Sequence, residues 1–129
     1  MHVYIGGAAN GKRDYVRELL AGREAAWYEG TLPERVDSTV VVAGLEDWMA
    51  RTELSEEEAI RQVMESLRGQ ETIVILTDIG RGIVPMDPAL RDLRDRCGRL
   101  YQRLLAEADE VTRIWYGLAQ TLKRRGEGL

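Results

Sequence analysis

The chain has 129 residues, a length that supports one domain with a hydrophobic core but not two. Its formal net charge is −4 and its positive charges are spread along the chain, which argues against a nucleic-acid partner. A single cysteine, Cys97, excludes an internal disulfide, and no apolar stretch approaches the length that spans a membrane, so we expect a cytoplasmic protein with no membrane partner.

The chain opens with an apolar segment, residues 2–5, which predicts a strand running into a glycine-rich loop. The loop fits the pattern G-x-x-x-x-G-K and supplies the candidate nucleotide-binding residues Gly6, Gly7, Ala8, Ala9, Asn10, Gly11, Lys12 and Arg13. In such loops the backbone N–H groups surround a phosphate at the positive end of a helix, and the lysine reaches the terminal phosphates. The alternative is an ordinary glycine-rich turn with an exposed lysine.

Arg13 stands where a serine or threonine normally completes this motif. The missing hydroxyl is usually a direct ligand of the nucleotide's magnesium, so the loop predicts phosphate binding but leaves ordinary phosphoryl transfer in doubt. Arg13 either neutralises phosphate charge in place of the metal or points to solvent. We predict no protein metal site, and the sequence does not decide whether magnesium takes part.

The remaining elements alternate between helix and strand. Expected helices cover residues 11–20, 45–50, a segment that begins at the capping box 55–58, and a long segment capped at Asp87; expected strands cover residues 25–28, 39–43, 72–76 and 111–116. This alternation predicts a P-loop NTPase-like three-layer α/β fold with a mostly parallel central sheet. We expect one domain over residues 1–123 and a flexible C-terminal tail over residues 124–129.

A second candidate loop, residues 78–85, follows the strand at 72–76 and begins with Asp78. Because ligands of such folds bind at the carboxyl ends of the strands, we expect Asp78 to lie near the phosphates, as a catalytic carboxylate for a metal or a substrate hydroxyl. The alternative is an acidic residue that is exposed there by chance.

The sequence around this loop resembles the adenosylcobinamide kinase/adenosylcobinamide-phosphate guanylyltransferase family of cobalamin biosynthesis. The resemblance rests on the first loop and on several later segments: G-R-G-I-V-P at 80–85, R-D at 94–95, G-R at 98–99, A-D-E-V at 108–111, Gly117 and L-K at 122–123. It implies a P-loop enzyme that uses GTP or ATP and a corrinoid, and that assembles as a homo-oligomer, a trimer in characterised members.

The departures from the family pattern all lie at positions where the family has residues that take part in its chemistry. The family guanylylates a histidine between its second and third strands, whereas the only histidine here is His2, which we interpret as an ordinary strand-end residue. Ala43 replaces the acid that ends the family's third strand; Glu46 or Asp47 is a possible substitute, but we favour an exposed helix face for both. Without the histidine, the covalent guanylyl-enzyme route is closed.

Three hypotheses remain. The first is a kinase-like phosphotransferase in which Lys12 and the loop amides hold the phosphates and Asp78 acts on the metal or the hydroxyl. The second is a non-catalytic nucleotide- or anion-binding relative with a regulatory role, acting through self-association or a partner. The third is a vestigial loop on a retained fold. Trp27, Trp48 and Trp115 are interpreted as core or interface residues, with an aromatic wall for a corrin ring as the minor alternative.

Overall fold

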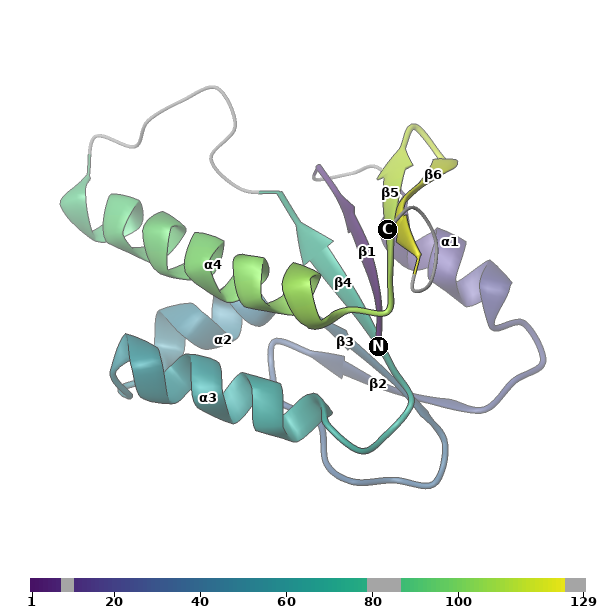
Figure 1. Cartoon of the computed structure of the whole chain (residues 1–129), viewed down its shortest axis with the longest axis horizontal. Coiled ribbons are helices and arrows are strands. Elements are labelled where there is room, and N and C mark those ends of the chain that lie inside the picture. The colour runs from purple at the N-terminus through teal and green to yellow at the C-terminus, as the bar shows by residue number, and fades with distance from the viewer. Residues whose placement is uncertain (8–10, 79–86, 125–129) are drawn as a thin grey trace.

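The computed structural model describes residues 1–7, 11–78 and 87–124. A six-stranded sheet has the order β2-β3-β4-β1-β5-β6, and five of its strands are parallel (Figure 1). The strands are β1 (His2–Gly6), β2 (Ala25–Glu29), β3 (Thr39–Ala43), β4 (Thr72–Thr77), β5 (Glu110–Trp115) and β6 (Leu118–Arg124). The predicted α/β fold with a mostly parallel sheet is confirmed.

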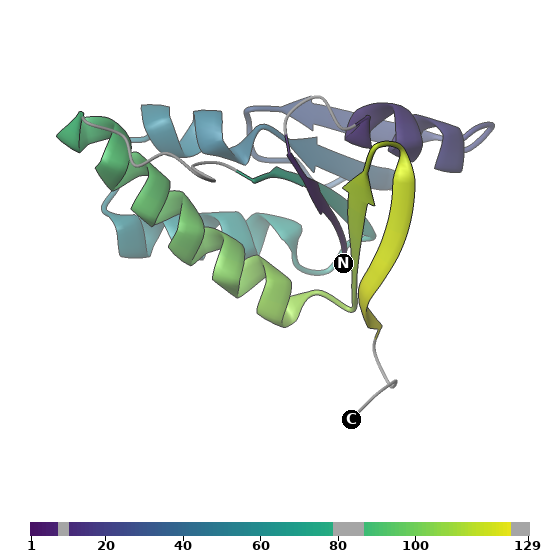
Figure 2. The ribbon, with the colours of Figure 1, turned by 90° about the horizontal axis from the view of Figure 1, so that it is seen from above.

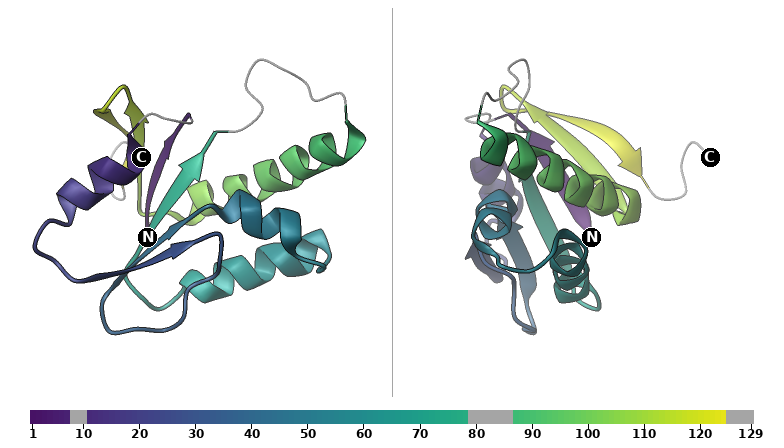
Figure 3. Two further views of the ribbon diagram at one scale, coloured as in Figure 1. Left: turned by 180° about the vertical axis from the view of Figure 1, so that it is seen from behind. Right: turned by 90° about the vertical axis from the view of Figure 1, so that its left-hand side faces the viewer.

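The helices cover both faces of this sheet. They are α1 (Lys12–Leu19), α2 (Leu45–Arg51), α3 (Glu56–Leu67) and α4 (Pro88–Glu107). Helix α1 lies on one side of the strands and α2, α3 and α4 lie on the other, as the views from above and from behind show (Figures 2 and 3). The sheet is therefore the middle layer of three.

Two hydrophobic clusters follow from this layering. Alternate residues of β3 point to opposite faces, so that Val40 and Val42 pack with α2, α3 and α4 while Val41 packs with α1. All five residues of β3 are buried, as the β-branched run predicts for a strand in the middle of a parallel sheet.

Local capping sets the helix starts that the sequence predicts. The Ser55 hydroxyl accepts a hydrogen bond from the backbone N–H of Glu58 at 3.2 Å, and the Asp87 carboxylate accepts one from that of Ala89 at 2.8 Å. Both helices therefore begin directly after the predicted cap residue.

The sequence did not predict β6. Residues 111–116 were expected to form the last strand, but β5 turns at Tyr116 and Gly117 into β6, which pairs antiparallel with β5 and continues to Arg124. Every residue of β6 is exposed, so the strand has no alternation of buried and exposed positions to reveal it. Arg124, expected in the tail, instead ends this strand; the rest of the tail lies outside the described residues. Within the described ranges, no helix is both long and apolar enough to cross a membrane.

Candidate functional site

The carboxyl ends of β1 and β4 meet where the candidate loop begins. The backbone N–H of Asp78 donates a hydrogen bond to the Gly6 carbonyl at 2.8 Å, which joins the start of one candidate loop to the start of the other. Gly6 also lies against β5, because a Cβ built on it would stand 2.4 Å from the Ile114 carbonyl oxygen. Only glycine allows the strands to approach this closely.

Lys12 is buried at the first turn of α1. Its side chain is 4% exposed, and its Nζ donates a hydrogen bond to the Gly7 carbonyl at 2.6 Å, so the amine turns back over the loop that precedes it. Burial lowers the pKa of Lys12, the neighbouring Arg13 lowers it further, and the Glu46 carboxylate opposes both effects. The exposed lysine of the alternative interpretation is not what the structure has.

Gly11 precedes this helix with φ of 75°, in the left-handed region that favours glycine. Ala8, Ala9 and Asn10, the middle of the predicted phosphate loop, lie outside the described residues, as do residues 79–86 of the second loop. The described part of the loop thus comprises its two ends, and each end has a glycine that other residues could replace only with strain. At Gly6 a Cβ would clash with β5, and at Gly11 the backbone is left-handed.

Arg13 does not simply point to solvent, because it is paired with a carboxylate; its action on phosphate charge stays a prediction. Its Nε donates to Glu29 Oε1 at 2.5 Å and its terminal nitrogen donates to Glu29 Oε2 at 3.1 Å, a bidentate pair with the last residue of β2. This pairing raises the pKa of Arg13 and lowers that of Glu29. The guanidinium is therefore held at the carboxyl edge of the sheet by a carboxylate.

Glu46, expected on an exposed helix face, is half-buried in the first turn of α2, whereas Asp47 is exposed as expected. The Tyr101 hydroxyl donates to Glu46 Oε2 at 3.4 Å and to the Thr77 carbonyl at 3.0 Å, so α2, β4 and α4 meet at this tyrosine. Burial raises the pKa of Tyr101, and the nearby carboxylates of Glu46 and Asp78 raise it further, so it stays a neutral donor. The sequence could not reveal this cluster, because its members come from three separate elements.

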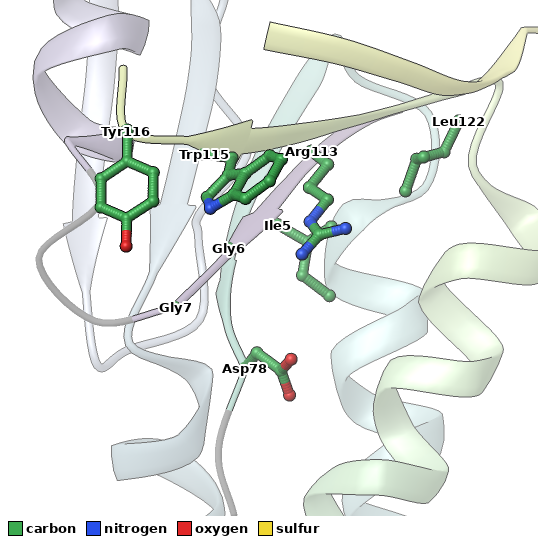
Figure 4. A pocket seen from close by; sticks show the side chains of 8 residues that line it. All are labelled: Ile5, Gly6, Gly7, Asp78, Arg113, Trp115, Tyr116 and Leu122. Carbon is green, nitrogen blue, oxygen red and sulfur yellow. The ribbon is translucent and has the colours of Figure 1, made fainter. Parts of the chain in front are cut away.

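A pocket of about 330 Å³ opens beside Gly6 and Gly7, and Asp78, Arg113, Trp115 and Tyr116 also line it (Figure 4). Figure 4 shows the side chains of Arg113 and Trp115 together on β5, with the Asp78 carboxylate at the other end of the space. Asp78 thus lies at the loop edge where the sequence placed it. Trp27 and Trp48 are partly buried against the core, but Trp115 is 52% exposed.

His2 lies at the amino end of β1, whereas the loop follows the carboxyl end. Three residues of extended strand lie between it and Gly6, a Cα–Cα distance of about 13 Å. His2 Nε2 and the Thr112 hydroxyl are hydrogen-bonded at 2.7 Å, and the ring stacks on Tyr4 with centroids 4.1 Å apart. It is a strand residue in contact with its neighbours, remote from the loop.

The side chains present do not make a usual magnesium site. Arg13 replaces the hydroxyl ligand and is paired with Glu29, and Ala43 ends β3 without a carboxylate. In residues 1–7, 11–78 and 87–124, no three His, Cys, Asp or Glu side chains group so that they could hold a metal ion. The arrangement instead offers a buried amine, two loop ends and a pocket beside them.

Comparison with known proteins adds two findings. The family model for cobinamide kinase / cobinamide phosphate guanyltransferase matches residues 30–122, well over half of the chain. The bifunctional adenosylcobalamin biosynthesis protein CobU of Salmonella typhimurium is 38% identical over 53 residues, which cover 41% of this chain and 29% of that protein. The match spans less than a third of this relative, and the family match begins after the candidate loop, so the loop is argued from its own geometry.

Proposed function

The chain belongs to the cobinamide kinase / cobinamide phosphate guanyltransferase family, and on that premise we propose that it is a P-loop protein of cobalamin biosynthesis that binds GTP or ATP through residues 6–13. The observation that carries this proposal is the burial of Lys12. A lysine removed from water needs a compensating anion or oxygen, and its Nζ lies on the Gly7 carbonyl at the entrance of a loop whose motif binds phosphate.

The first form of the proposal is a kinase-like phosphotransferase acting on adenosylcobinamide. The amine of Lys12 moves from Gly7 to the terminal phosphates, and Asp78 takes the proton of the corrinoid's hydroxyl. The hydroxyl oxygen then bonds to the terminal phosphorus as the bond to the nucleoside diphosphate breaks. We propose no guanylyl transfer, because His2 lies at the wrong end of β1 to replace the family's histidine.

The second form is a non-catalytic nucleotide-binding relative, and the pairing of Arg13 with Glu29 favours it. Arg13 stands where the usual hydroxyl ligand of magnesium would be and is held by Glu29, and Ala43 removes a second support. Such a protein would act in the cytoplasm through self-association as a homo-oligomer, such as a trimer, or through a partner enzyme, without nucleic acid or membrane.

Calorimetric titration with GTP and ATP, each with and without magnesium, tests the proposal. Lys12→Ala is expected to abolish nucleotide binding. Lys123→Ala is the matched control: the other lysine of the chain donates to the Leu105 and Ala106 carbonyls at the end of α4, so its loss leaves nucleotide affinity unchanged. Undiminished affinity of Lys12→Ala for GTP and ATP would contradict the assignment of the nucleotide site to this loop.

The magnesium response separates the two forms. A kinase requires the metal for phosphoryl transfer, whereas a binder that has lost the protein ligands of magnesium should bind GTP or ATP equally well with and without it. Arg13→Ser is expected to strengthen the magnesium dependence of GTP or ATP affinity. No change in that variant means that the rest of the metal site is missing too, and this result supports the non-catalytic form.

A further inference from the structure

An ion pair joins the first turn of α1 to the end of β2. The Arg13 guanidinium donates to both carboxylate oxygens of Glu29, at 2.5 Å from Nε and 3.1 Å from the terminal nitrogen. Arg13 directly follows Lys12, and Glu29 is paired in register with Ala43 on the neighbouring strand. The pair therefore connects residue 13, where a hydroxyl ligand of magnesium is usual, to the neighbour of residue 43, where the family has an acid.

The Glu29 carboxylate rests against the backbone that follows β3. A Cβ built on Gly44 would lie 3.1 Å from Glu29 Oε2 and 2.9 Å from the backbone nitrogen of Gly30. Gly44 also has φ of 72°, so glycine leaves room for the carboxylate at a position where other residues are strained. Because β2 and β3 fix the place of Glu29, the longer side chain of Arg13 is the partner that can move.

The pair is exposed enough to open at little cost. The side chains of Arg13 and Glu29 are 35% and 53% exposed, and water solvates both partners of such a pair when they separate. Arg17, one helical turn further along, is a second positive charge that acts on Glu29. Its own guanidinium is held by Asp14 at 3.1 Å and lies 5.1 Å from the centre of the Trp27 ring. Glu29 therefore keeps a positive neighbour when Arg13 turns away.

A phosphate is the chemical alternative to this carboxylate. A guanidinium binds carboxylate and phosphate oxygens in the same bidentate geometry. In loops of this motif the residue after the lysine acts on the β- and γ-phosphates through magnesium, whereas Arg13 carries a positive charge of its own. Glu29 and a polyphosphate are therefore alternative ligands of one guanidinium.

We propose that Glu29 is an internal competitor of the nucleotide: it holds Arg13 until a β- or γ-phosphate of GTP or ATP displaces it from the guanidinium. Nucleotide affinity is then set by the exchange of one anion for another on Arg13, and a monophosphate does not bring about the exchange. This inference rests on the proposed function, because it describes the regulation of the same phosphate site.

Calorimetric titration with GTP, GMP and tripolyphosphate, without magnesium, tests the inference. Glu29→Gln keeps the size of the side chain and removes its charge. This variant is expected to bind GTP and tripolyphosphate about fivefold more tightly, the effect of removing one exposed ion pair, with no gain for GMP. In an Arg13→Gln background, Glu29→Gln should produce no gain with any of the three ligands.

Two control variants separate the exchange from a general effect of charge. Asp47→Asn removes a carboxylate that acts on Arg13 through its charge, but leaves the pair with Glu29 in place. Glu71→Gln breaks a similar pair at the opposite edge of the sheet, where Arg23 donates to Glu71 at 3.1 Å. Both controls should keep GTP affinity within about twofold of the unmodified protein. Circular dichroism verifies that each variant is folded before it is titrated.

The outcomes distinguish this inference from the proposed function. Unchanged or weaker GTP binding by Glu29→Gln, with binding lost in Lys12→Ala, would overturn the exchange and leave the phosphate loop standing. An equal gain in Asp47→Asn, or a gain that persists in the Arg13→Gln background, would also overturn it, because charge at a distance then explains the effect. Absence of binding to GTP and tripolyphosphate by the unmodified protein would overturn both the exchange and the proposed function.

Discussion

Replacing Gly6 with alanine tests how the candidate loop is anchored to the sheet. The new Cβ would lie 2.4 Å from the Ile114 carbonyl oxygen, a backbone atom that cannot rotate away. Because Cβ contacts below 3.0 Å are essentially never observed, β1 and β5 must separate by at least about 0.6 Å, the difference between 3.0 and 2.4 Å. The same Cβ meets Lys12 Cδ at 3.4 Å, an ordinary contact, so the clash falls on the strands.

The expected loss of stability follows from three contributions. Overpacking of this kind costs roughly 1–3 kcal/mol, and weakening the hydrogen bond from Asp78 to Gly6 costs about 1 kcal/mol more. Replacing a strand glycine with alanine stabilises the protein by about 0.5–1 kcal/mol, because alanine lowers the conformational entropy of the unfolded chain. The net expectation for Gly6→Ala is a destabilisation of about 2 kcal/mol, small enough for a domain of this size to remain folded.

Urea unfolding followed by circular dichroism measures this value, and Gly98→Ala is the control. Gly98 is exposed within α4 and a Cβ there meets nothing within 4 Å, so alanine should stabilise the protein by about 1 kcal/mol. Both substitutions replace glycine with alanine, but one should lower the free energy of unfolding and the other should raise it. The unfolding free energies of the two variants should therefore differ by about 3 kcal/mol. Equal unfolding free energies for the two variants would refute the close approach of Gly6 to β5.

Two further substitutions address the turn and the amino end of β1. Tyr116→Asn should raise the free energy of unfolding by about 1 kcal/mol, because asparagine tolerates the left-handed conformation better, and a stability loss in urea unfolding would contradict the strain at this turn. Burial lowers the pKa of His2, although Glu110 opposes this, so the unfolded state binds the proton more readily. Stability should therefore be full above pH 6.5 and decline as the pH falls below that value, and His2→Gln should flatten this part of a pH–stability profile; an identical profile in that variant would exclude His2 as the cause.

The sequence predicted the features that depend on local pattern. The buried run of β3, the capped starts of α3 and α4 and the placement of Asp78 at the loop edge could be inferred because each leaves a signal within a few residues. Strand β6 left none, since its residues are exposed and its turn has tyrosine where asparagine is typical. Glu29 was not identified from sequence, and Glu46 was wrongly expected on an exposed helix face, because their contacts with Arg13 and Tyr101 depend on other elements.

The position of β1 has a consequence for how the chain folds. Although it is the first strand in sequence, it lies between β4 and β5, so His2 is paired with both Ile73 and Glu110. Neither neighbour is nearby in sequence, and such distant pairings must close long loops before they gain any stabilisation. During synthesis both edges of β1 therefore stay unpaired with their native neighbours until β4 and then β5 have emerged from the ribosome. The loop that β1 carries can be anchored on both sides only after β5 has been made.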